Sequence, residues 1–310
     1  MKKLILLLSV QITLSQSCAA FAEELRIVTS LPSFASIAKS IGGDQVSVTS
    51  VAPAQFNPHF IEARPSDVLR LKRADLFIHG GLDLEAWRGP LVDAAARAEI
   101  RQGGPRELDL SRGIPLLNVP QQAVSRSQGD IHLFGNPHYW MSPDNGARIA
   151  RSIAAKLSEL DPANSALYSQ HLAQFLSDLN AKSEIWKRDS APLRGKEVLG
   201  YHDEWVYLMT FLGLKMERFV EPKPGIPPSP RQLSELEAYI KSNRIPALIQ
   251  PTYFSKDAAE SLNRSTGIQV LLLCQNVGEL PECGDYLSML NYDVEQIVAT
   301  LKGSASSKEN

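Results

Sequence analysis

The stretch that organises the chain is DPANSALYSQHLAQFLSDLNAKSEIWKRDS, residues 161–190. Pro162 suits a first helical turn, and neither glycine nor proline follows it until Pro192. The pattern predicts one helix roughly 40 Å long, at about 1.5 Å per residue. Such a helix can link two domains, although the same pattern also suits a long surface helix. Apolar side chains recur at helical spacing, namely Tyr168, Leu172, Phe175, Leu179 and Trp186.

Strands and helices alternate on both sides of this helix. Before it, the β-branched runs LRIVTS (25–30) and VSVTSV (46–51) are each followed by a helical pattern. After it, the same alternation restarts with KEVLGYH, PALIQPTYF and IQVLLL as the strands. This order predicts α/β lobes with mainly parallel sheets. We therefore expect an N-terminal α/β lobe at 23–160, a rigid linking helix at 161–190, a C-terminal α/β lobe at 191–303 and a disordered tail at 304–310.

The bulk composition limits the class of protein. The chain has 310 residues, of which 44% are hydrophobic, and that length accommodates two domains. The formal net charge is -2, and no basic face interleaved with aromatic residues is evident. Binding to phosphates needs such a face, so we expect no nucleic-acid partner. We expect the protein to be a monomer.

The first 22 residues, MKKLILLLSVQITLSQSCAAFA, have the pattern of a secretory signal peptide cleaved after Ala22. Their apolar run is too short to span a membrane. Cys18 raises the alternative of a lipoprotein anchor, but Ser15 stands where a lipobox needs an aliphatic residue. Soluble export to the periplasm is therefore favoured. Export leaves Cys274 and Cys283 in an oxidising compartment, where a close pair favours one disulfide bond.

Three of the six histidines share a setting. His59 in FNPHFIEARPSD and His138 in GNPHYWMSP both follow Asn-Pro, and His202 directly follows a predicted strand. In open α/β sheets ligands bind beyond the carboxyl ends of the strands, so two facing lobes would bring these side chains into one cleft. Three imidazoles with a water or another oxygen donor form a tetrahedral zinc site. The alternative is that each histidine only fills a loop or the core.

The other histidines carry weaker signals. His79 ends a strand, and we interpret it as structural. His171 lies on the long helix and is expected to be exposed. His132 lies in the polar loop 118–135, where a solvated residue is the preferred interpretation and a role in collecting metal is the alternative. The Pro-rich run EPKPGIPPSP (221–230) is either a stiff connector or a wall of the cleft. The sequence has no G-x-S-x-G, H-E-x-x-H or paired C-x-x-C motif.

Together these segments resemble the zinc/manganese solute-binding proteins of bacterial ABC importers. The stretches NPHFIEARPSDVLRLKRADLFIHGGLDLEAW, GNPHYWMSPDNGARIARSIAAKLSELDPANSALY and GYHDEWVYLMTFLGL are similar, in this order, to the three ligand segments of the family. The resemblance implies two lobes joined by a rigid helix, with His59, His138 and His202 as metal ligands in the cleft between the lobes.

The resemblance leaves the fourth ligand open. Many members place a carboxylate near the end of the last strand, where this chain has Cys274. A thiolate there could bind zinc, whereas a disulfide to Cys283 would leave the position to water or another oxygen donor. Asn57 stands where an Asp is frequent. The histidine-rich loop of many zinc-binding members is absent, and His132 is the only histidine in that region.

These observations favour a periplasmic protein that captures a divalent metal and delivers it to a membrane permease. Zinc is favoured over manganese, because imidazoles suit a borderline ion better than the harder Mn²⁺. No enzymatic turnover is expected. The main alternative is an exported zinc-dependent hydrolase with a three-histidine site, in which Asp203 or Glu204 would serve as the base. A surface adhesin, which needs no metal, is a third possibility.

Overall fold

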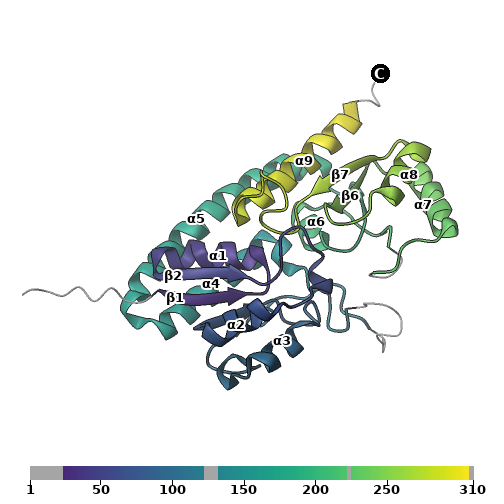
Figure 1. Ribbon diagram of the computed structural model, residues 1–310. Coiled ribbons are helices and arrows are strands. Elements are labelled where there is room, and N and C mark those ends of the chain that lie inside the picture. Colours follow the sequence, from purple (N-terminus) through teal and green to yellow (C-terminus); the bar gives the residue numbers. More distant parts are fainter. Residues whose placement is uncertain (1–23, 122–131, 222–224, 307–310) are drawn as a thin grey trace, which may run out of the picture.

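The chain forms two α/β lobes that lie side by side along one long helix (Figure 1). The computed structural model describes residues 24–121, 132–221 and 225–306, so the predicted signal peptide lies outside the described residues. The first lobe contains a parallel four-stranded sheet in the order β2-β1-β3-β4. Its strands are β1 (Leu25–Thr29), β2 (Val46–Ser50), β3 (Leu76–His79) and β4 (Glu107–Asp109).

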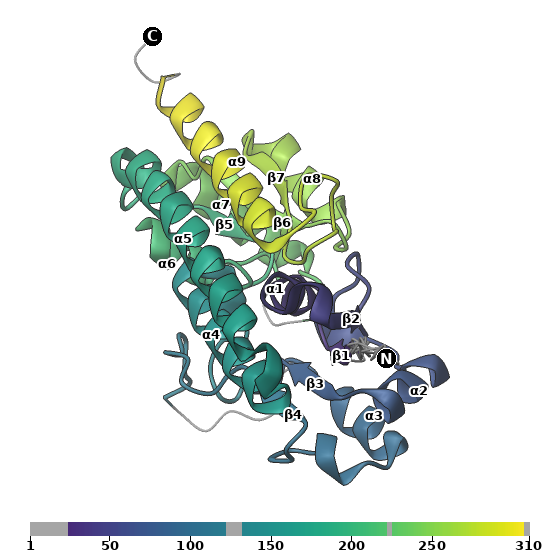
Figure 2. The same ribbon diagram turned by 90° about the vertical axis from the view of Figure 1, so that its left-hand side faces the viewer.

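Helices cover both faces of this first sheet. One pair, α1 and α4, packs together on the side of the linking helix, and the other pair, α2 and α3, packs on the opposite side (Figure 2). This arrangement follows from parallel strands, which need a crossover connection between each strand and the next. The four helices are α1 (Pro32–Gly42), α2 (Pro65–Arg73), α3 (Arg88–Ala95) and α4 (Pro143–Leu160).

The predicted linking helix is present as α5 (Ser165–Ser190). It starts a few residues later than expected, because Pro162–Asn164 form a 3-10 turn. The helix contacts α1 and α4 of the first lobe and α6 and α9 of the second, which confirms that it bridges the lobes. The predicted apolar face is buried at Tyr168, Phe175, Leu179 and Trp186 and half-buried at Leu172.

The second lobe is built on a parallel three-stranded sheet in the order β5-β6-β7. Its strands are β5 (Leu199–Gly200), β6 (Ala247–Pro251) and β7 (Gln269–Leu273). Its helices are α6 (Val206–Leu212), α7 (Pro230–Asn243), α8 (Asp257–Thr266) and α9 (Tyr286–Ser306). The expected tail at 304–310 is thus wrong for its first three residues, which continue α9. None of the described helices is long and apolar enough to cross a membrane.

The larger of two hydrophobic clusters among the described residues runs through both lobes. It extends from the first sheet across α5 to Leu273 at the end of β7 and to α9, and it includes the fully buried Trp140, Trp186 and Trp205. A smaller cluster fills the space between the second sheet and helices α7 and α8. Because the interior is closely packed across the boundary, side chains from the two lobes are held in fixed positions where the lobes meet.

Candidate metal centre

Four histidines meet where the carboxyl ends of the two sheets face each other. They are His59, His132, His138 and His202, and one ring nitrogen from each lies within 4.8 Å of the others. His59 lies in the loop between β2 and α2, His132 and His138 lie between β4 and α4, and His202 follows β5 by two residues. The structure therefore brings together all three predicted ligands and adds a fourth imidazole.

The four rings have a nearly tetrahedral arrangement. All six distances between ring centroids fall between 5.1 and 5.9 Å. The Nε2 atoms of His59 and His138 are 3.3 Å apart. Four nitrogens bound tetrahedrally to zinc at about 2.05 Å would be separated by about 3.3 Å. The spacing of the described side chains therefore fits a small tetrahedral cation.

The repeated Asn-Pro-His sequence has a local structural cause. In each copy the asparagine Oδ1 accepts a hydrogen bond from the histidine backbone N–H, at 3.0 Å for Asn57 and His59 and at 2.9 Å for Asn136 and His138. The intervening proline fixes its own φ, so the turn has few alternatives. The motif is thus a rigid turn that sets the direction of an imidazole.

Further hydrogen bonds attach these two turns to the rest of the molecule. Trp87 donates to the Pro58 carbonyl at 2.8 Å, which holds the first turn. Asn136 Nδ2 donates to the backbone and the carboxylate of Asp203, at 2.8 and 2.9 Å, and so links the second turn to the opposite lobe. The aromatic residues after His138 are fully buried, and Trp140 Nε1 donates to the Gln275 carbonyl at 2.9 Å. His138 therefore sits on a backbone that both lobes hold.

The structure shows that His132 is not the solvated loop residue that the sequence analysis preferred. It is buried, with 8% exposure, and its ring stacks on that of His59 at a centroid distance of 5.1 Å. Its Nδ1 lies 3.5 Å from the Asp83 carboxylate, which also accepts the Leu133 N–H at 2.7 Å. The carboxylate of Asp83 draws this part of the loop inward. No local motif in the sequence marks this inward position of His132, because it depends on the distant Asp83.

Three of the imidazoles, those of His132, His138 and His202, contact a protein group through Nδ1 and leave Nε2 toward the centre of the cluster. The Nδ1 of His132 lies 3.5 Å from the Asp83 carboxylate. The Nδ1 of His202 lies 3.4 Å from Glu221, and the Nδ1 of His138 lies 2.7 Å from Gln275 Nε2. Contacts of this kind orient metal-binding imidazoles in proteins. None of these partner groups could be identified from the sequence.

The pKa values of the clustered histidines are shifted in different directions. Burial, followed by the charge of His132 and His202, holds the pKa of His59 well below its usual value. Burial likewise lowers the pKa of His138, with neighbouring histidines adding to the effect. Burial also opposes the charge on His202, but nearby carboxylates, Asp203 first, raise its pKa to about 9. The imidazoles of His59 and His138 are therefore neutral near pH 7.

Several buried polar atoms at the centre lack hydrogen-bond partners within the described part of the chain. They are the Nε2 atoms of His132 and His202 and the Oδ1 atom of Asp203. Asp203 Oδ1 is 3.0 Å from His202 Nε2 and 3.9 Å from His132 Nε2, which makes an ion pair without hydrogen-bond geometry. Unsatisfied buried polar atoms are costly, and a bound cation would satisfy both nitrogens.

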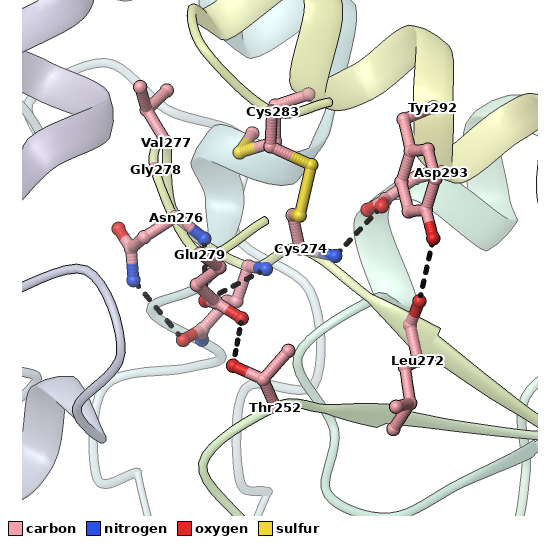
Figure 3. Close-up of a disulfide and its surroundings, with 12 residues drawn as sticks. Thr252, Leu272, Cys274, Asn276, Val277, Gly278, Glu279, Cys283, Tyr292 and Asp293 are labelled. Carbon is pink, nitrogen blue, oxygen red and sulfur yellow. Dashed lines mark hydrogen bonds between the residues drawn. A yellow bond between two sulfur atoms is a disulfide. The ribbon is translucent and has the colours of Figure 1, made fainter. Parts of the chain in front are cut away.

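Cys274 is not available as a ligand, because it forms a disulfide with Cys283, as the sequence suggested (Figure 3). The backbone N–H of Cys274 also donates to the Asp293 carboxylate at 2.9 Å. The disulfide bond therefore fixes the loop after β7 and leaves no thiolate to bind a metal at the site.

The two remaining histidines lie elsewhere. His79 is buried and pairs with Glu107 at 2.8 Å, and Arg88 and Arg112 lie against the same pair, so its structural interpretation fits the contacts. His171 is half-buried rather than exposed, because its Nδ1 bonds to the Ile41 carbonyl at 3.0 Å. The expectation of exposure was wrong, since α5 packs against α1 at this point.

Two lobes on one linking helix, with a cluster of four histidines between them, are the arrangement expected of a solute-binding protein of the ABC-importer type. Comparisons with known proteins agree. The family model described as zinc-uptake complex component A, periplasmic (ZnuA), matches residues 27–300, and the chain belongs to this family.

Solved and curated relatives cover nearly the whole chain. A crystal structure of ZnuA is 26% identical, has a TM-score of 0.76 and covers 90% of this chain and 100% of its own. The metal ABC transporter substrate-binding lipoprotein ScbA of Streptococcus cristatus is 26% identical over 289 residues, 90% of each chain. The manganese ABC transporter substrate-binding lipoprotein PsaA of Streptococcus pneumoniae is 24% identical over 294 residues, 92% of this chain and 91% of its own.

Proposed function

We propose that the protein captures one zinc ion between its lobes and delivers it to the permease of an ABC importer. His59, His132, His138 and His202 are the proposed ligands, each through Nε2. The observation that carries the proposal is the set of six nearly equal centroid distances, 5.1 to 5.9 Å, among imidazoles from both lobes. Four nitrogen donors at tetrahedral spacing are the coordination that zinc favours.

The choice of zinc over manganese rests on the donor set. Relatives carry both names, since the family is described by zinc and several curated relatives by manganese. Imidazole suits zinc and other borderline ions, whereas Mn²⁺ prefers carboxylate, carbonyl and water ligands. The carboxylates of Asp83 and Glu221 contact Nδ1 atoms instead of the centre. From there they offset the charge of a buried dication without coordinating it.

The same geometry argues against the hydrolase alternative. A catalytic zinc site keeps one coordination position open for water, whereas four imidazoles fill a tetrahedral sphere. Glu204, one of the two candidate bases, accepts a hydrogen bond from Tyr253 at 2.9 Å. Asp203 faces the Nε2 atoms of His202 and His132. With four imidazoles bound, the zinc keeps no coordination position at which either carboxylate could activate a water.

We also propose that the mature chain is a soluble periplasmic protein that begins after Ala22. The curated relatives ScbA and PsaA are named lipoproteins, so the alternative is an acylated N-terminus at Cys18. The mass of the mature N-terminal peptide from exported protein distinguishes the two. A peptide beginning at Glu23 supports cleavage after Ala22, and a diacylated peptide beginning at Cys18 would contradict it.

Metal competition tests the proposed cargo. Chelator-treated protein is titrated with zinc and with manganese in the presence of a competing chelator. We expect one zinc per chain and a zinc affinity at least about 100-fold higher than that for manganese, following the preference of imidazole donors. Equal affinities, or tighter manganese binding, would contradict the proposal. In a parallel screen, hydrolysis of ester and amide substrates that depended on zinc would restore the enzyme alternative.

A further inference from the structure

A chain of polar side chains from the second lobe ends on a histidine of the first. Gln275 follows β7 by two residues, and Tyr253 follows β6 by two. Gln275 Nε2 lies 2.7 Å from His138 Nδ1, and its Oε1 lies 2.5 Å from the Tyr253 hydroxyl. The same hydroxyl lies 2.9 Å from Glu204 Oε1. Gln275 and His138 are both fully buried, so water does not compete for these contacts.

The donor-to-acceptor direction of these hydrogen bonds determines which nitrogen of His138 carries a proton. When the Gln275 amide N–H donates to Nδ1, the neutral ring must carry its proton on Nε2. That Nε2–H can donate to Nε2 of His59, which is 3.3 Å away. In this tautomer His138 has no lone pair on Nε2 and cannot bind a metal through it.

A half-turn of the Gln275 amide reverses the direction. Amide oxygen and nitrogen are almost the same size, so the exchange needs little space. Oε1 then accepts from the His138 Nδ1–H, and Nε2 donates to the Tyr253 oxygen, whose O–H donates to Glu204. Every group keeps a partner, apart from the marginal 3.5 Å contact between Asn276 Nδ2 and Oε1, which is lost. The His138 Nε2 lone pair becomes free.

We propose that Gln275 and Tyr253 are positioning residues that select the metal-binding tautomer of His138. The proposal rests on the proposed function, because a metal must bind at Nε2 for the tautomer to matter. It also gives the second lobe a direct role in preparing a ligand supplied by the first. Loss of such outer contacts typically weakens metal binding by about 10–100-fold.

Two substitutions at Gln275 separate positioning from simple packing. Gln275→Leu removes the acceptor, so zinc affinity should fall by about 10–100-fold. Gln275→Glu keeps an oxygen that accepts from Nδ1–H, so its affinity should stay within about threefold of wild type. Tyr253→Phe removes the group that holds the amide in the reversed orientation and should weaken zinc binding by about tenfold. Zinc affinity is measured by chelator competition on the full mature chain.

Thr252→Val is the matched control, because Thr252 neighbours Tyr253 and donates to Glu279 at 3.2 Å without contacting a histidine. Its zinc affinity should be unchanged, and the thermal unfolding of each zinc-free variant establishes that it folds. Long-range ¹H–¹⁵N spectra of the zinc-loaded wild type should place a proton on His138 Nδ1.

Wild-type affinity in Gln275→Leu, or an equal loss in Gln275→Leu and Gln275→Glu, would overturn the positioning role while leaving the proposed function intact. A wild-type protein that binds no zinc would instead refute the proposed function, and the positioning role with it.

Discussion

Replacing His132 with alanine should weaken zinc binding by at least about 100-fold. Loss of a contact to a ligand costs about 10–100-fold, so loss of a ligand itself should reach or exceed the upper end of that range. A factor of 100 corresponds to about 2.7 kcal/mol of binding free energy. Binding should not vanish, because His59, His138 and His202 remain and water can enter the space left by the ring. The Asp83 carboxylate keeps its hydrogen bond from the Leu133 N–H.

The assay is zinc competition against a chelator of known affinity at constant pH. His171→Ala is the matched control, since His171 is a half-buried histidine with one hydrogen bond, to the Ile41 carbonyl, and lies on α5 outside the cluster. The control should bind zinc as wild type does. A loss of less than about threefold in His132→Ala would refute the fourth-ligand argument and return His132 to the status of a loop residue.

Three further predictions concern stability and pH. Replacing Cys274 and Cys283 together with alanine should lower the free energy of unfolding by about 2.6 kcal/mol for a sequence separation of 9, and unchanged urea unfolding would contradict this. Because the pKa of His202 is raised to about 9, zinc must displace its proton, so apparent zinc affinity should rise about tenfold from pH 7 to pH 8, and equal affinities would exclude this. Burial opposes the charge on Asp75, but its arginine partners, Arg26 first, lower the pKa of the carboxyl group. The ionised Asp75 therefore stabilises the fold at pH values above its unfolded pKa, and this stabilisation is lost as the pH falls through the lower folded pKa. Asp75→Asn should therefore unfold with a weaker dependence on pH below about 4, and a dependence equal to that of wild type would rule out this contribution.

The linking helix and three of the four histidines could be predicted because their signals are local. An uninterrupted helical spacing over 161–190 is enough to predict α5. The repeated Asn-Pro-His sequence encodes its own turn through the asparagine side chain, so His59 and His138 could be recognised from neighbouring residues. His202 was found because it directly follows a strand.

The fourth histidine could not be predicted, because its position depends on distant residues. His132 is drawn inward by Asp83, about 50 positions earlier, and faces Asp203, about 70 positions later. No periodicity or turn motif marks such a contact. Gln275 was missed for the same reason, since its contact with His138 depends on how the two lobes meet. The end of the last helix was placed too early because Gly303 and the serines at 304 and 306 have weak helical preference.

The most direct test of a four-imidazole zinc site is the extended X-ray absorption fine structure of the zinc-loaded protein at the zinc edge. We expect four nitrogen neighbours at about 2.0–2.1 Å, with the multiple scattering of four imidazole rings and no sulfur. A sulfur neighbour at about 2.3 Å, or scattering from fewer than four imidazoles, would contradict it.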